Sequence, residues 1–261
     1  MDLFALPPVA AVLGGAYHAL MGLSHLLEPA LGAGAAAAAV VAVTLVVRAA
    51  LVPVGLSQAR AERTRMRLAP RIAELQRRHR KDPEALQRAT MQLYADEGTT
   101  PLAGCLPMLL QAPVVGVIYA VFVHAEIAGG ANALLGHTLF GVPLGTSLVG
   151  ALSAGVPPVA TAVVLGVLVL AIALVGELTR RATLPGGPLA VPTPSAAPQG
   201  YPGIQGVLGA LQFATAVVAC FVPLAAGLYL LVTVTWTLVQ RILLRRRFPL
   251  GTEGGVRPSI P

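Results

Sequence analysis

The chain has little charge. Asp, Glu, Lys and Arg make up 11% of its 261 residues, whereas soluble domains contain about 25%. Hydrophobic residues make up 56%, and several apolar runs reach the length of about 20 residues that a helix needs to cross a bilayer. These values exclude a soluble globular protein. Because backbone polar groups in lipid must be satisfied within their own segment, the spans are expected to be helices.

Other absences narrow the function. The two cysteines, Cys105 and Cys220, both fall in apolar runs, so they are interpreted as small packing residues and not as a disulfide framework. The chain lacks a GxxxxGK[ST] motif, which argues against a nucleotide-driven protein. No serine–histidine pair falls within the spans. No enzyme activity, cofactor or metal site is predicted.

Basic residues are missing from two long stretches, 1–47 and 89–179. Ten of the 18 Lys and Arg residues lie between Arg60 and Arg88, and the others are Arg48, the pair Arg180 and Arg181, and five from Arg241 onward. Lys and Arg near span ends mark the cytoplasmic side of a membrane protein. The basic segments are therefore expected inside, and the two stretches without basic residues contain the expected outer segments.

This alternation predicts an all-α integral membrane protein with five transmembrane helices, its N-terminus outside and its C-terminus in the cytoplasm. The segments expected, in chain order, are an extracytoplasmic or interfacial N-terminal helix (1–34), a first span (35–58), a cytoplasmic helical hairpin (59–98), a second span (101–123), an outer loop (124–157), a third span (158–177), a Pro-rich cytoplasmic loop (178–203), the fourth and fifth spans (204–244) and a basic cytoplasmic tail (245–261).

Residues 3–27 leave three alternatives open. They are apolar enough for a signal peptide or for a sixth span, but a signal peptide needs a basic first region and none is present. A helix lying in the outer interface is favoured, with His18, Ser24 and His25 as its more polar residues.

The expected hairpin differs in composition from the rest of the chain. Asp82-Pro83 is a typical helix start, because Asp accepts hydrogen bonds from the first turn and Pro lacks an N–H that would be unpaired there. Gly98 is a typical helix end. Pro70 is expected to bend the first arm. The apolar positions form narrow helical stripes, Leu68, Ile72, Leu75 and His79 in the first arm and Leu86, Ala89 and Leu93 in the second.

Two interpretations of the hairpin remain open. It is either a charged loop that only fixes topology or a docking arm for anionic lipid, a nascent chain or the ribosome. The docking interpretation is favoured because two capped amphipathic helices exceed what topology requires. The residues expected to dock are Arg71, Arg77, Arg78, Arg80 and Lys81 in the hairpin and Arg245, Arg246 and Arg247 in the tail.

Arg48 lies inside the uncharged run that forms the expected first span. An arginine at the middle of a membrane helix costs on the order of 2.5–3.5 kcal/mol on insertion scales. Either the guanidinium snorkels to the interface, or it faces a wet cavity where it has a function. Thr44 lies one turn earlier on the same helix face.

Other polar residues in the spans predict a groove around Arg48. Packed together, they would line a hydrophilic groove. The alternatives are that the hydroxyls bond to their own backbone and that the aromatic residues belong to the interfacial belt. The expected groove residues, besides Arg48 and Thr44, are Gln111 in the second span and the stripe Tyr229, Thr233, Trp236 or Thr237, and Gln240 in the last.

The order of these motifs resembles the membrane protein insertases of the YidC, Oxa and Albino family. The resemblance is carried by TLVVRAALVPVGLSQ, the hairpin start RLAPRIAELQRRHRKD and MQLYADEGTTPLAGCLPMLLQAPVVGVIY, and more loosely by VPLAAGLYLLVTVTWTLVQ. Three positions depart from the family pattern: Thr100 stands where an Asn is usual, Leu230 where a Trp is usual, and Thr233-Val234 where a Ser-Asn pair is usual.

The resemblance implies a five-helix fold in the bacterial plasma membrane, with a groove open to the cytoplasm and to lipid but closed outside. Arg48 and Gln111 occupy the family's groove positions. The expected function is the insertion of small membrane proteins and help in folding larger ones. The expected partners are nascent membrane proteins and lipids, with the ribosome and the Sec translocon as further candidates and no DNA.

A small-molecule or ion transporter and an intramembrane protease are the alternatives. Transporters tend to have internal repeats, and none is found here. A proton-coupled transporter needs a buried carboxylate, for which Glu177, beside Arg180 and Arg181, is the only candidate in the spans.

Overall fold

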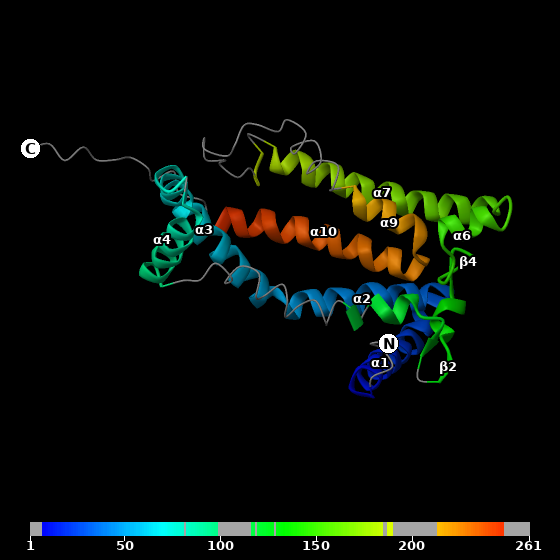
Figure 1. Cartoon of the computed structure of the whole chain (residues 1–261). Coiled ribbons are helices and arrows are strands. Elements are labelled where there is room, and N and C mark those ends of the chain that lie inside the picture. Colours follow the sequence, from blue (N-terminus) through cyan, green and yellow to red (C-terminus); the bar gives the residue numbers. More distant parts are fainter. Residues whose placement is uncertain are drawn as a thin grey trace, which may run out of the picture.

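The computed structural model describes residues 7–80, 82–98, 116–117, 119–127, 129–184, 187–189 and 213–247. Three long helices run side by side along the molecule: α2 (Ala35–Ala50), α7 (Val159–Thr183) and α10 (Leu224–Arg247) (Figure 1). Helix α10 packs against both of the others, and α9 (Ala214–Phe221) packs against α7. The expectations for Lys81, Cys105, Gln111, most of the second span and most of the Pro-rich loop lie outside the described residues.

Three stretches of helix are long and apolar enough to cross a membrane, Pro7–Ala50, Val159–Thr183 and Leu224–Arg247. The described chain is therefore that of a mostly helical membrane protein, as predicted. These three stretches lie within the described residues, and the expected second and fourth spans extend beyond those residues.

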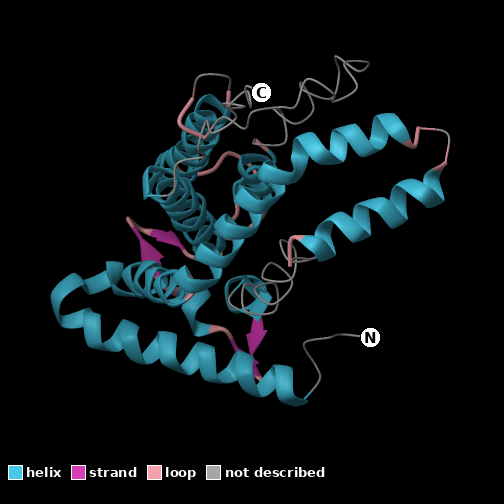
Figure 2. Ribbon diagram, turned by 90° about the vertical axis from the view of Figure 1, so that its left-hand side faces the viewer, coloured by secondary structure: helices cyan, strands magenta, loops and turns pink. Residues whose placement is uncertain are grey.

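The N-terminal helix α1 (Pro7–Leu31) packs against α2 at one end of the bundle. The 3-10 turn Gly32–Gly34 joins the two helices, and Gly32 has a φ of +53°, a conformation that glycine adopts without a steric penalty. Figure 2 shows α1 along its length, whereas α7 and α10 are foreshortened, so α1 crosses the direction of the bundle.

Helices α3 (Val52–Arg78) and α4 (Pro83–Asp96) pack against each other as the two arms of a hairpin at the opposite end (Figures 1 and 2). The predicted cap is confirmed, because Asp82 Oδ1 accepts a hydrogen bond of 2.9 Å from the Ala85 N–H. Gly98 follows α4 with a φ of +61°, which confirms it as the helix end. Pro70 lies inside α3 without ending it.

The first arm begins earlier than expected. The expected first span ended at residue 58, but α2 ends at Ala50 and α3 starts at Val52, with only Leu51 between them. Pro53 explains the break, since it has no N–H to donate to the Ala49 carbonyl and its ring crowds that carbonyl. One kinked helical path therefore leads from α2 into the hairpin.

The expected outer loop is a folded module, defined here as residues 124–153. It contains the antiparallel pairs β1 (Glu126–Ile127) with β2 (Gly130–Ala131) and β3 (Thr138–Leu139) with β4 (Val142–Pro143), a 3-10 turn (Ala133–Gly136) and the helix α6 (Leu148–Ser153). The all-α expectation missed these strands. Two-residue strands are too short to produce the apolar–polar alternation by which a strand is recognised.

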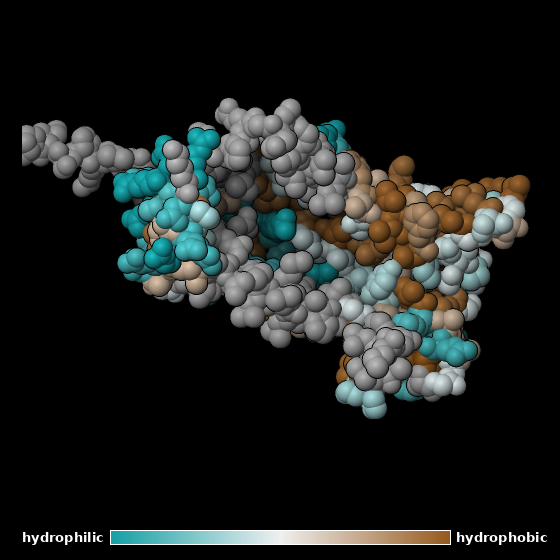
Figure 3. All heavy atoms as spheres, in the orientation of Figure 1, coloured by the Kyte–Doolittle hydropathy of each residue, from teal (hydrophilic) through white to brown (hydrophobic). Residues whose placement is uncertain are grey.

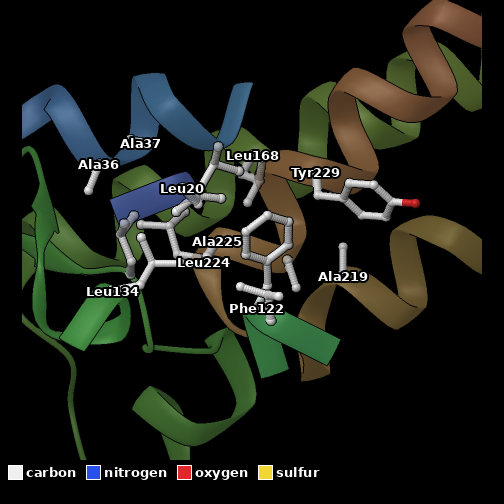
Figure 4. Close-up of a cluster of buried hydrophobic side chains, with 14 of the residues drawn as sticks. Leu20, Ala36, Ala37, Phe122, Leu134, Leu168, Ala219, Leu224, Ala225 and Tyr229 are labelled. Carbon is white, nitrogen blue, oxygen red and sulfur yellow. The ribbon is translucent and has the colours of Figure 1, made fainter. Parts of the chain in front are cut away.

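The hydrophobic core lies where the outer module meets the helices. Figure 4 shows Leu20 of α1, Ala36 of α2, Leu134 of the module, Leu168 of α7 and Leu224 of α10 converging in one cluster. Each of these side chains is at most 6% exposed. Figure 3 shows the opposite distribution at the two ends: hydrophilic surface covers the hairpin end, and hydrophobic surface dominates the α6–α7 end.

Candidate functional site

The predicted polar residues of the first and last spans lie on two helices that pack together. Arg48 occupies the last turn of α2, and α10 carries Tyr229, Thr233, Trp236 and Gln240 at helical spacing. We call these five residues the Arg48 site. Figure 3 shows a hydrophilic recess in the middle of the molecule, separate from the charged hairpin end.

Tyr229 marks the boundary between this site and the hydrophobic core. The residue is 3% exposed, and its ring packs against Phe122 and Tyr119 with centroid separations of 5.9 and 6.4 Å. Figure 4 shows the hydroxyl pointing away from the core cluster. That hydroxyl interacts with the Arg48 guanidinium. An aromatic layer thus separates the apolar core from the polar site.

Arg48 is half-buried, and no carboxylate pairs with it among the described residues. Its described polar partner is the Tyr229 hydroxyl, which is neutral. A phenol is a hydrogen-bond acceptor, but it does not neutralise a cation. The positive charge of Arg48 therefore remains uncompensated by this part of the protein, which is the electrostatic condition for attracting an anion.

The hydroxyls near Arg48 differ in their availability. Thr44 is 1% exposed and donates to the Val40 carbonyl at 2.7 Å, so its polar hydrogen is used within α2. Thr237 likewise donates to the Thr233 carbonyl at 2.8 Å, which leaves Trp236 as the α10 stripe residue. Thr233 Oγ1 lies near the Tyr229 hydroxyl but is buried without a hydrogen bond of good geometry among the described residues.

The far end of the stripe is ordered by a side-chain pair. Trp236 Nε1 donates a hydrogen bond of 2.8 Å to Gln240 Oε1. The other end of the same amide lies against Gly55 of α3, where a Cβ atom would come within 2.0 Å of Gln240 Nε2. Sequence reasoning missed Gly55, because nothing in a glycine's local context reveals which side chain from a distant helix will lie on it.

The predicted docking residues are found at the hairpin end. Arg71 Nη1 donates to Glu97 Oε1 at 2.9 Å, and Arg67 also pairs with Glu97, so two α3 arginines hold the end of α4. Arg78 pairs with Glu74 one turn earlier. Arg77 and Arg80 are exposed. Arg245, Arg246 and Arg247, expected in the basic tail, form the last turn of α10.

Glu177, the alternative candidate for proton coupling, is occupied by two arginines. Arg180 donates to both of its carboxylate oxygens at 2.7 and 2.8 Å, and Arg181 Nε donates at 2.7 Å. All three residues lie in the last turns of α7. The carboxylate is thus part of a helix-end ion pair.

Comparison with known proteins places this arrangement among inner membrane proteins. Residues 27–251 match the family described as "60Kd inner membrane protein". The chain is 38% identical over 79 residues to "Membrane protein insertase YidC" of Clostridium perfringens, which covers 30% of this chain and 33% of that protein. It is 38% identical over 112 residues to the protein of the same name from Granulibacter bethesdensis (42% and 18%), and 39% identical over 87 residues to that of Helicobacter pylori (33% and 16%). The matched segments thus span a third or less of these relatives.

Proposed function

Because the chain belongs to the 60Kd inner membrane protein family, we propose that it is a membrane protein insertase that works through the Arg48 site. The observation that carries the proposal is Arg48 itself, a half-buried cation in an apolar helix with a neutral phenol as its described partner. A charge in such a position is costly and is usually retained for a function.

The Arg48 site would lower the barrier to moving a polar segment into the membrane. A short acidic tail would meet the positive charge of Arg48 partway into the membrane. This counter-charge would offset part of the free energy that the carboxylates lose when they leave water. The Thr233 hydroxyl is buried without a hydrogen bond of good geometry among the described residues, so it would be able to bond a tail that enters beside Tyr229. The hydrophobic span of the substrate then moves into lipid and supplies the net driving force.

The aromatic layer at Tyr229 would limit how far the tail travels inside the protein. Tyr119, Phe122 and Tyr229 separate the site from the core below the outer module. The groove is therefore proposed to open toward the hairpin end and toward lipid, but not through the outer end. Five spans remain the proposed topology, with the second and fourth completed by residues outside those described.

The proposed orientation has the hairpin in the cytoplasm of a bacterium. Three basic segments gather at the hairpin end: α3, the end of α7 with Arg180, and the end of α10 with Arg247 (Figure 1). Clustering of basic residues on one side supports a cytoplasmic location for that side. This basic end is proposed to dock anionic lipid, the nascent chain or the ribosome, with the Sec translocon as a further candidate partner.

A transporter is less well supported by the described residues. Coupling to protons needs a carboxylate that titrates within the membrane, and Glu177 is held by Arg180 and Arg181 at a helix end. A lone cation suits a substrate that brings its own negative charge. The proposed activity requires no catalytic residue and no cofactor.

An insertion assay distinguishes a role of the Arg48 charge from a role of the shape of its side chain. Proteoliposomes containing wild type, Arg48→Lys or Arg48→Leu receive single-span substrates that differ only in the number of Asp and Glu residues in the translocated tail. We expect Arg48→Leu to insert the acidic-tailed substrates at least about tenfold more slowly, the factor that corresponds to roughly 1.4 kcal/mol. Arg48→Lys should keep most of the activity, because attraction needs charge more than the shape of a guanidinium.

The uncharged tail is the matched control for this experiment. All three proteins should insert that substrate at similar rates. Equal insertion of the acidic tails by wild type and Arg48→Leu would show that the Arg48 charge has no part in insertion by this protein.

A further inference from the structure

Gly55 contacts Gln240 of the Arg48 site but has no role in the proposed function. Gly55 lies in the first turn of α3, directly after the break at Leu51. A Cβ atom at position 55 would lie 2.0 Å from Gln240 Nε2 and 3.1 Å from Gln240 Cδ, far closer than any side chain tolerates. The absence of a side chain at Gly55 is therefore what makes room for the Gln240 amide.

The Gln240 amide is also held from its other side. Its oxygen accepts the 2.8 Å hydrogen bond from the Trp236 indole, one turn earlier on α10. Trp236 is half-buried and is the single tryptophan of the chain. The long Gln240 side chain loses rotamer freedom when it bridges two helices. The hydrogen bond from Trp236 and the close contact with Gly55 offset that loss of entropy.

This contact lies on the hairpin side of the Arg48 site. Gln240 follows Tyr229 by eleven residues, which corresponds to about 16 Å along α10 toward its basic end. Gly55 follows Arg48 by seven residues along the path that leads to the hairpin. The Gln240 amide therefore bridges α3 and α10 between Arg48 and the proposed cytoplasmic opening.

We propose that Gly55, Gln240 and Trp236 form a latch across the inner end of the Arg48 site, which an entering substrate tail opens by displacing the Gln240 amide. The proposal rests on the insertase function and adds Gly55 as a positioning residue. The displaced amide keeps its hydrogen-bonding groups, so it exchanges the indole for a backbone group of the substrate. Such an exchange of one hydrogen bond for another has little net cost.

Tryptophan fluorescence measures whether this latch is open or closed, and it needs no insertion assay. The probe is quenching of Trp236 by acrylamide in proteoliposomes, with and without a synthetic single-span peptide whose tail carries aspartates. In the wild type, the peptide should increase quenching. Gly55→Ala and Gln240→Ala should each increase quenching without the peptide, since the first displaces the amide and the second removes it. The fraction of molecules in which the Gln240 amide has left Trp236 should rise roughly five- to tenfold in these variants, the factor expected when one neutral hydrogen bond is lost.

Two controls distinguish a latch from ordinary packing. Gly166→Ala is the matched glycine variant, because a Cβ there meets no atom within 4 Å, and its quenching should equal that of the wild type. The double variant Gly55→Ala/Gln240→Ala should quench no more than either single variant, since both remove the same contact. Quenching by Gly55→Ala at the wild-type level, or additive effects in the double variant, would overturn the proposal.

A cross-link tests whether the latch must open. Cysteines replace Gly55 and Gln240 in a protein in which Cys105 and Cys220 are alanine, and a short bifunctional thiol reagent joins them. Joining should abolish insertion of acidic-tailed substrates and the peptide-induced quenching, whereas a monofunctional reagent should not. Insertion at the unmodified rate after joining would overturn the proposal. If the wild type inserts no substrate at all, the insertase function fails, while peptide-induced quenching still decides the latch.

Discussion

The two ends of the molecule use polar groups in opposite ways. In the outer module, a buried polar side chain has all of its described groups paired. Asn132 is 6% exposed, its amide donates to the Val121 and His124 carbonyls at 2.8 and 2.9 Å, and its oxygen accepts from the Leu134 N–H. The first N–H groups of α10, at Leu224 and Ala225, donate to carbonyls of the same module at 2.9 Å.

At the hairpin end, polar groups pair on the surface. Arg67 and Arg71 keep about two thirds of their side-chain surface exposed while they hold Glu97. Exposed ion pairs contribute only about 0.2–1 kcal/mol each, because water competes for both charges. The outer end is therefore built as a fixed structure and the hairpin end as one that rearranges at low cost. The proposed insertase would need this division, because the module end would stay closed while the hairpin end admits substrate.

Asn132→Ala should produce the largest loss of stability. Three partners, two of them in buried hydrogen bonds and one in a part-buried one, lose these bonds at once, which costs on the order of 3 kcal/mol. The measurement is thermal unfolding in detergent. Ser147→Ala is the matched control, because among the described residues this cap accepts one exposed hydrogen bond, from the Gly150 N–H. Equal melting temperatures for the two variants would remove the distinction between buried and surface polar groups.

Gly227→Ala tests how tightly α7 and α10 pack near the outer module, independently of the Asn132 hydrogen bonds. A Cβ at position 227 of α10 would lie 2.5 Å from Leu168 Cδ2 of α7, inside the core. Overpacking of this kind costs about 1–3 kcal/mol. The same unfolding assay should show destabilisation for this variant and none for Gly166→Ala. A neutral Gly227→Ala would mean that α7 and α10 separate easily even at the outer end.

Asp82→Ala should have a smaller and local effect. Loss of this cap costs about 1 kcal/mol of helix stability, and the loss should be confined to α4. Hydrogen exchange is the measurement: amides of Glu84–Leu86 should exchange faster while those of α7 are unchanged. Faster exchange throughout α7 would show that the hairpin and the bundle unfold as one unit.

Glu97→Gln should have the smallest effect on stability, about 0.5 kcal/mol. It removes the charge that Arg67 and Arg71 share, so the separation of the two arms should become more variable. Spin labels at exposed Arg77 and Met91 would report the distribution of that separation. A melting temperature lowered as much as by Asn132→Ala would show that the hairpin end is as rigid as the outer module.

Periodicity and caps were enough to predict much of the helical fold. Asp82 and Gly98 bound α4 as expected, because caps are local chemistry. The break at Leu51 was not foreseen, since Pro53 lies inside the apolar run of the expected first span, and a proline within a membrane helix is compatible with either a bent or a broken helix. Within the site, spacing predicted that Tyr229, Thr233 and Gln240 share one face of the last span, whereas the proximity of Arg48 to Tyr229 follows from the packing of α2 against α10. Gly55 could not be identified, because its role depends on a side chain from a distant helix, and Asn132 was missed because its partners belong to an irregular turn that has no periodic pattern.

The helical path through Leu51 has a mechanical consequence. Helix α3 has 27 residues and is therefore about 40 Å long, while Arg48 stands only three residues before the break. A tilt of a few degrees at Leu51 moves the tip of the hairpin by several ångströms and the neighbourhood of Arg48 by a small fraction of that. The hairpin thus acts as a lever whose long arm is α3 and whose short arm is the segment between Leu51 and Arg48. A weak force applied at the tip, where Arg77 and Arg78 lie, becomes a larger force on the contact between Gly55 and Gln240.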